Sequence, residues 1–176
     1  MNADNFVEQV KKAKPNKESL LSLGVSDEYI AKVDQAYSIN QRYTTAKYTQ
    51  PLMDLVDRFE VSFLEIGMIG FNSKLEESSI GSIVGTVESD LLVVDDVLGE
   101  VKVVEYNTNH TLWSCAQNEA NFLDAIAVAA AFLEKATFDD DLYENQEAIR
   151  AVSEHCSMLA GGEKYQSFYQ MLLGLE

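Results

Sequence analysis

The residues best suited to chemistry lie in the second half of the chain, where acidic side chains stand in close pairs. Glu88 with Asp90, and Asp95 with Asp96, have the spacing that acid–base catalysis or Mg²⁺ binding uses. Such pairs are also expected by composition alone, because the chain carries 29 Asp and Glu among 176 residues. We therefore interpret them as part of a solvated acidic surface, and we predict no catalytic residue and no metal site.

The other reactive group is Cys115, which follows His110 by five residues in the run HTLWSC. A cysteine nucleophile needs a neighbouring base, so a small hydrolase that uses Cys115 remains a remote alternative. Neither Cys115 nor Cys156 belongs to a CxxC or Cys/His ligand spacing. We expect both to be unpaired and dispensable, and we expect no cofactor. The chain also has no nucleophile elbow, phosphate-binding glycine loop or HExxH motif.

Charge is the most informative bulk property, since 13 Lys and Arg stand against 29 Asp and Glu, a net charge of −16. Residues 1–50 hold seven basic and six acidic residues, whereas residues 51–176 hold six basic and 23 acidic ones. Nucleic acids and anionic membrane surfaces attract the opposite sign, so neither is an expected partner. An acidic surface attracts basic proteins and speeds their encounter, although solubility alone also accounts for such a charge.

The first 17 residues contain no apolar segment of the kind that directs secretion. The longest apolar stretch, Ala125 to Leu133, is far too short to span a bilayer. We therefore expect a cytoplasmic protein.

The elements that would position the acidic residues can be read from the spacing of apolar residues. Residues 1–50 are predicted to form short helices, with Asn16 and Ser26 as N-caps and Gly24 ending the first of the two helices. Four β-rich runs follow, and their short connections favour antiparallel pairing. The predicted strands are Glu60–Ile66, Gly81–Val87, Leu91–Val94 and Glu100–Tyr106. Between the last two, Asp95 and Gly99 begin and end a tight hairpin loop.

After the sheet, Asn118 is a favourable N-cap for a long apolar helix over residues 118–136. Two further helices are predicted at about 142–160 and 163–173. The expected fold is α+β, with a single, mainly antiparallel sheet over about residues 60–106 packed by the helix 118–136 and flanked by N- and C-terminal helices. We predict one domain over 1–176, made of a helical segment (1–50), the sheet and core helix (51–136) and the C-terminal helices (137–176).

The segment from about residue 60 to 135 resembles the SUKH superfamily, which includes fungal cell-wall regulators, bacterial immunity proteins and herpesvirus tegument proteins. The run that carries the resemblance consists, in order, of Ile83-Val84-Gly85, then Glu88 and Asp90 leading into LLVVD, then Gly99-Glu100-Val101 with Val103, then Trp113, and a helix capped by Asn118 that carries Phe122-Leu123. The resemblance implies an α+β domain that works by binding a partner.

Many bacterial members of this superfamily neutralise a toxin by tight binding, and nuclease or deaminase toxins present basic surfaces. We therefore expect a non-enzymatic protein-binding module that meets a basic protein through an acidic face. The candidate partner-binding residues are Glu88, Asp90, Asp95, Asp96 and Glu100, with Phe71 and Trp113 as apolar anchors unless these two belong to the core. The alternative is a housekeeping regulatory adaptor of the same fold.

Overall fold

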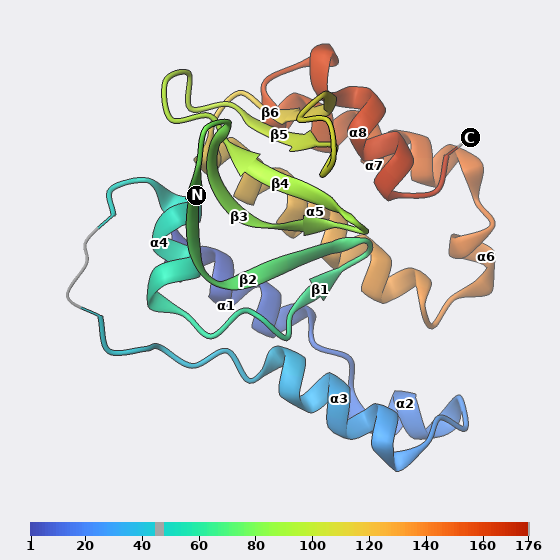
Figure 1. Cartoon of the computed structure of the whole chain (residues 1–176). Coiled ribbons are helices and arrows are strands. Elements are labelled where there is room, and N and C mark those ends of the chain that lie inside the picture. Colours follow the sequence, from blue (N-terminus) through green and yellow to red (C-terminus); the bar gives the residue numbers. More distant parts are fainter. Residues whose placement is uncertain (45–47, 176) are drawn as a thin grey trace.

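One antiparallel sheet follows the helical N-terminal segment, as the β-branched runs of the sequence predict (Figure 1). The computed structural model describes residues 1–44 and 48–175. Within these residues, six strands pair in chain order, each antiparallel to the next. They are β1 (Glu65–Ile66), β2 (Ile69–Ser78), β3 (Gly81–Val87), β4 (Asp90–Val94), β5 (Val101–Val104) and β6 (Thr111–Ala116). The predicted α+β fold with one sheet and flanking helices is confirmed.

Alternation of side chains gives the sheet its two faces. Leu92 and Val94 of β4, with Val101 and Val103 of β5, belong to the main hydrophobic core, whereas the intervening Lys102 points to the opposite face, where it pairs with an acid. The register between β3 and β4 shifts between Ile83 and Gly85. A Cβ at Gly85 would lie 2.1 Å from the carbonyl oxygen of Gly70, so only glycine lets these strands approach this closely.

One predicted strand needs correction, and two strands of the sheet were not predicted. The predicted strand Glu60–Ile66 is wrong over most of its length, because residues 61–64 form a turn and only β1 at its end pairs with the sheet. Strand β2, the longest in the sheet, was not predicted, since its second half is polar and exposed and carries no apolar alternation. Strand β6 was also missed, whereas β3 has the predicted bounds and β4 pairs with β5 as predicted.

Helices flank the sheet, and α5 (Glu119–Ala136) is the central one. It contacts both edge strands, β1 and β6, and among the helices it packs chiefly against three (Figure 1). These are α1 (Ala3–Ala13), α4 (Pro51–Arg58) and α7 (Gln146–Ala160). The remaining elements are α2 (Lys17–Ser22), α3 (Asp27–Tyr37), α6 (Asp140–Tyr143), the 3₁₀ helix η1 (Glu163–Tyr165) and α8 (Gln166–Leu172).

The predicted helix caps are confirmed, because Asn16, Ser26 and Asn118 each accept a backbone N–H at the start of α2, α3 and α5. The single helix predicted over 142–160 is wrong, since the chain forms α6 and α7 instead. Asn145 separates them because its side chain accepts the N–H of Ala148 and starts a new helix. Buried side chains from α1, α4, the sheet, α5, α7 and α8 form one core cluster.

Glu119 is a buried charged residue that joins two of these helices. Its side chain, in the first turn of α5, accepts hydrogen bonds from the N–H groups of Leu52 (2.8 Å) and Met53 (3.0 Å) at the start of α4. Gln50 makes no side-chain cap there, so the carboxylate of α5 caps α4. Burial raises the pKa of Glu119, while the two backbone hydrogen bonds act in the opposite direction.

We predict that Glu119→Ala lowers the free energy of unfolding by about 2–4 kcal/mol, because it leaves two buried N–H groups without an acceptor. Glu119→Gln should cost less, since its amide oxygen can still accept. Urea unfolding measures both variants. Glu147→Ala is the matched control, as Glu147 is an exposed acid in the first turn of α7. Equal stabilities for Glu119→Ala and the control would contradict this role.

Candidate functional site

The turn between β4 and β5 is built around the carboxylate of Asp95. One of its oxygens, Oδ1, accepts the N–H groups of Val97 (3.0 Å) and Leu98 (2.9 Å). The other, Oδ2, lies 2.9 Å from the Lys102 ammonium on β5. Gly99 closes the turn with φ of 73°, in the left-handed region that glycine favours, as the sequence predicts. The turn is thus fixed by its own backbone and by an ion pair.

These contacts favour the ionised form of Asp95 and so lower its pKa. The hydrogen bond from the Leu98 N–H, the Lys102 ammonium and the Val97 N–H together lower the pKa of Asp95 to about 2. The sequence predicts Asp95 as a surface charge available to a partner, whereas the structure makes it a structural residue of the turn. Reversing its charge would break the turn as well as change the surface.

Two further contacts fix the turn to the rest of the molecule. Asp96 accepts a hydrogen bond of 2.8 Å from the Ser82 hydroxyl at the start of β3. Glu100 forms an ion pair with Lys164 of η1. Figure 1 shows this turn at the upper left, beyond the arrowhead of β4. The turn is therefore tied to a neighbouring strand and to the C-terminal helical segment.

The tip of this rigid turn carries two apolar side chains in solvent. Val97 is 91% exposed and Leu98 is 73% exposed. Turn positions ordinarily favour Gly, Asn, Asp, Ser or Pro, and nothing in the hydrogen bonding of this turn requires an aliphatic side chain. Sequence analysis missed both residues, although two aliphatic residues between Asp96 and Gly99 were a usable signal. We define the hairpin tip as Asp96, Val97, Leu98 and the adjoining acids Asp95 and Glu100.

The other predicted acids do not belong to the hairpin tip. Glu88 lies in the turn before β4, with φ of 53°, and Asp90 begins β4, where it accepts the N–H of Tyr106. Asp90 and Asp95 are thus separated by the length of β4, about 17 Å at ~3.3 Å per residue. Figure 1 shows the two turns at opposite ends of that strand. The five predicted acids form two separate groups rather than one face.

The two predicted aromatic anchors have different positions. Phe71 is only 5% exposed and packs edge-to-face on Phe6 of α1, with ring centroids 6.4 Å apart. Phe71 thus belongs to the core, the alternative that the sequence left open, because its alternating position in β2 turns its side chain inward. Trp113 lies on the edge strand β6, where it is half-buried and packs against the core. The exposed apolar side chains at the hairpin tip are therefore Val97 and Leu98, not the predicted aromatic residues.

Neither cysteine is placed for nucleophilic chemistry. Cys115 and Cys156 are free thiols with no exposed surface, whereas His110 is exposed in the turn before β6. Burial raises the pKa of Cys115 well above its usual value and raises that of Cys156 to about 12. A reactive cysteine instead has a lowered pKa and a sulfur atom that is accessible to solvent. These thiols behave as small apolar groups of the core.

Comparison with known proteins found no match in protein-family models, among curated proteins or among solved structures. Within residues 1–44 and 48–175, no three His, Cys, Asp or Glu side chains gather as a metal ion would require. In the same part of the chain, no helix is both long enough and apolar enough to cross a membrane. The function must therefore be argued from the surface itself.

We predict that neither thiol of the folded protein reacts with a disulfide reagent such as DTNB on the time scale of minutes, because both are buried. Two thiols per chain should react at once in denaturant. Cys115→Ser should change the free energy of unfolding by about 1–3 kcal/mol. Rapid modification of Cys115 in the folded protein would contradict its assignment to the core.

The lowered pKa of Asp95 predicts a specific pH dependence of stability. Its contribution is fully present above the ordinary value of 3.8 and is lost as the pH falls from about 4 to about 2. Asp95→Asn keeps an acceptor for the turn but loses the ion pair, so it should cost about 1 kcal/mol at pH 7 after solvent screening. Urea unfolding of both proteins between pH 2 and 7 should show this difference vanish at the acid end. A difference in free energy of unfolding that stays constant from pH 7 to pH 2 would contradict this role of the Asp95 charge.

Proposed function

We propose that this protein works by binding a protein partner, and that the hairpin tip is the contact surface. The observation that carries the proposal is the pair of exposed aliphatic side chains, Val97 and Leu98, on a turn fixed by Asp95. Interface anchors are apolar side chains surrounded by polar groups, and a rigid loop loses little conformational entropy on binding. Asp96 and Glu100 would form part of such a polar rim.

The charge of the chain supports a basic partner. A net charge of −16 produces a long-range field that attracts basic proteins and repels nucleic acid. At the hairpin tip itself, Asp95 and Glu100 are already paired with lysines, so Asp96 is the acid left to meet a cation there. The net negative charge would therefore mainly speed the encounter with a basic partner. Val97 and Leu98 would mainly stabilise the complex once it has formed.

The more specific form of the proposal is a cytoplasmic immunity or antitoxin-like protein that neutralises a basic nuclease or deaminase toxin. The resemblance to the SUKH superfamily supports it, and an α+β fold with one antiparallel sheet is compatible with that resemblance. A housekeeping regulatory adaptor would use the same surface, and the identity of the captured partner separates the two. A hydrolase using Cys115 is disfavoured by the burial of that thiol.

The hairpin tip is tested by Val97→Ser combined with Leu98→Ser, which removes the apolar pair and retains the turn. Affinity capture from the native host at low salt, followed by quantitative mass spectrometry, should show the main partner depleted about tenfold or more. Leu21→Ser with Leu23→Ser is the matched control, because these residues of the α2 segment are 50% and 51% exposed. A partner retained equally by both double variants would overturn the proposed surface.

A further inference from the structure

A cavity of about 380 Å³ lies beside α3, on a different part of the molecule from the hairpin tip. Its lining comes from α3, from the turn at residues 61–64 with the start of β1, and from the end of α5. Figure 1 shows α3 at the lower edge of the molecule, beneath β1. The volume lies in the range that small-molecule sites occupy, ~300–1,000 Å³.

Three aromatic side chains line this cavity, those of Tyr29, Tyr37 and Phe63. Tyr29, Val33 and Tyr37 follow one another at steps of four residues along α3, so they lie on one face of that helix. Phe63 comes from the turn before β1. Tyr29 is 47% exposed and Phe63 is 53% exposed, and neither belongs to the core cluster. Part of both rings is therefore open to an occupant of the cavity.

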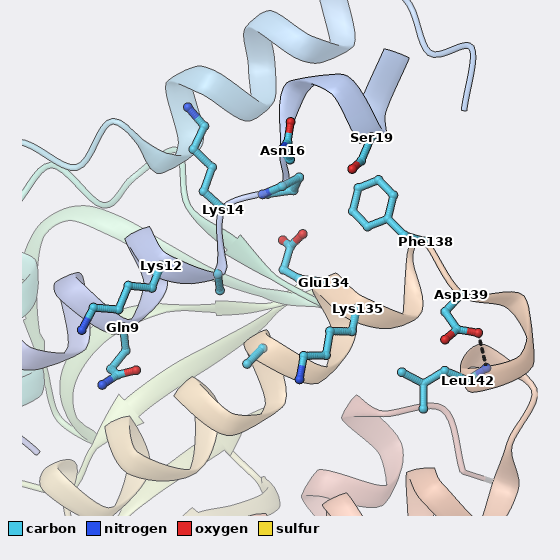
Figure 2. A pocket seen from close by; sticks show the side chains of 13 residues that line it. Gln9, Lys12, Lys14, Asn16, Ser19, Glu134, Lys135, Phe138, Asp139 and Leu142 are labelled. Atoms are coloured by element: carbon cyan, nitrogen blue, oxygen red, sulfur yellow. Dashed lines mark hydrogen bonds between the residues drawn. The ribbon is translucent and has the colours of Figure 1, made fainter. Parts of the chain in front are cut away.

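The same cavity is lined by a half-buried carboxylate, that of Glu134 near the end of α5. It accepts a hydrogen bond from the Tyr37 hydroxyl, and across residues 1–44 and 48–175 it forms no ion pair. Figure 2, a view of the adjoining cavity that Glu134 also lines, shows its carboxylate and the Lys135 side chain pointing in opposite directions. Burial raises the pKa of Glu134, because its charge lacks a counter-ion. A cation in the cavity would supply one.

The other charged side chains of the lining also favour a cation. Glu65, at the start of β1, is exposed and meets no lysine or arginine in the part of the chain that the structure describes. Lys32 lines the cavity too, but its ammonium is paired at 3.1 Å with Glu28, a residue outside the lining. Two carboxylates without a counter-ion therefore stand against one ammonium that already has one.

We propose that this cavity binds a small organic ammonium ion, with its charge beside Glu134 and its alkyl groups against the rings of Tyr29 and Phe63. An ammonium group is attracted to the face of an aromatic ring within about 6 Å, and the attraction grows as water is excluded. An alkylated ammonium suits this lining because it presents charge and apolar surface together.

Choline is a suitable probe, and 3,3-dimethylbutan-1-ol is its uncharged counterpart, with a carbon atom in place of the quaternary nitrogen. Titrated into the full chain, choline should shift backbone amide NMR signals saturably, with the changes centred on residues 29–37 and 62–65. The alcohol should bind several-fold more weakly, because it lacks the charge. Glu134→Gln keeps an acceptor for the Tyr37 hydroxyl but removes the charge, so it should weaken choline binding about tenfold.

Tyr29→Leu with Phe63→Leu keeps apolar side chains but removes two rings, and it should also weaken choline binding about tenfold. Tyr43→Leu with Tyr106→Leu is the matched control for the rings, since these tyrosines are 97% and 65% exposed and do not line the cavity. Glu147→Gln, an exposed acid of α7, is the control for the charge. Both controls should bind choline as the unaltered protein does.

The proposal is overturned by an absence of saturable shifts, by shifts centred elsewhere or by equal binding of choline and the alcohol. Equal weakening in the cavity variants and their controls would overturn it as well. Because the hairpin tip is untouched by these changes, the outcome is independent of the proposed protein partner.

Discussion

The carboxylate of Glu119 is the contact on which the arrangement of this protein depends. Helix α4 begins with Pro51 and lacks a side-chain cap of its own, so its N–H groups at Leu52 and Met53 need an acceptor from elsewhere in the fold. Glu119 provides it from the first turn of α5, at a cost in desolvation that two hydrogen bonds offset in part. Strand β6 ends at Ala116, just before this residue, so the same contact fixes the sheet edge relative to both helices.

The helix that Glu119 begins has two different faces. Phe122, Leu123 and Ile126 are fully buried in the core. Ala127, Val128 and Ala131 are only partly covered and line a cavity between α1 and α7. A helix that is apolar around most of its girth is expected to be buried on all sides. Here one side stays open, and the hairpin tip likewise leaves Val97 and Leu98 in solvent. The proposed contact surface rests on the second of these places, the turn fixed by Asp95.

Local chemistry made part of the fold predictable. Asn16, Ser26 and Asn118 accept N–H groups within three residues of themselves, and Gly99 satisfies the turn in which it lies, so short-range signals were sufficient. Contacts between distant residues were not predictable. Glu119 caps an N–H group 67 residues away, and the polar half of β2 pairs with β3, a strand that follows it in the chain. At the candidate site, sequence analysis found the acids of the turn but could not show that Asp95 and Glu100 pair with Lys102 and Lys164. Nor could it separate Glu88 and Asp90 from them, because that depends on strand geometry.

The central claim is that the hairpin tip touches a protein partner, and photocrosslinking tests it most directly. A benzophenone amino acid placed at Leu98 would be irradiated in cells of the native host, with the same group at Met158 as the control. Met158 is 70% exposed on α7, close to the 73% of Leu98, so the two positions differ in place rather than in accessibility. The account predicts one dominant protein adduct from position 98 that is absent from position 158. The same adducts from both positions, or none from position 98, would contradict it.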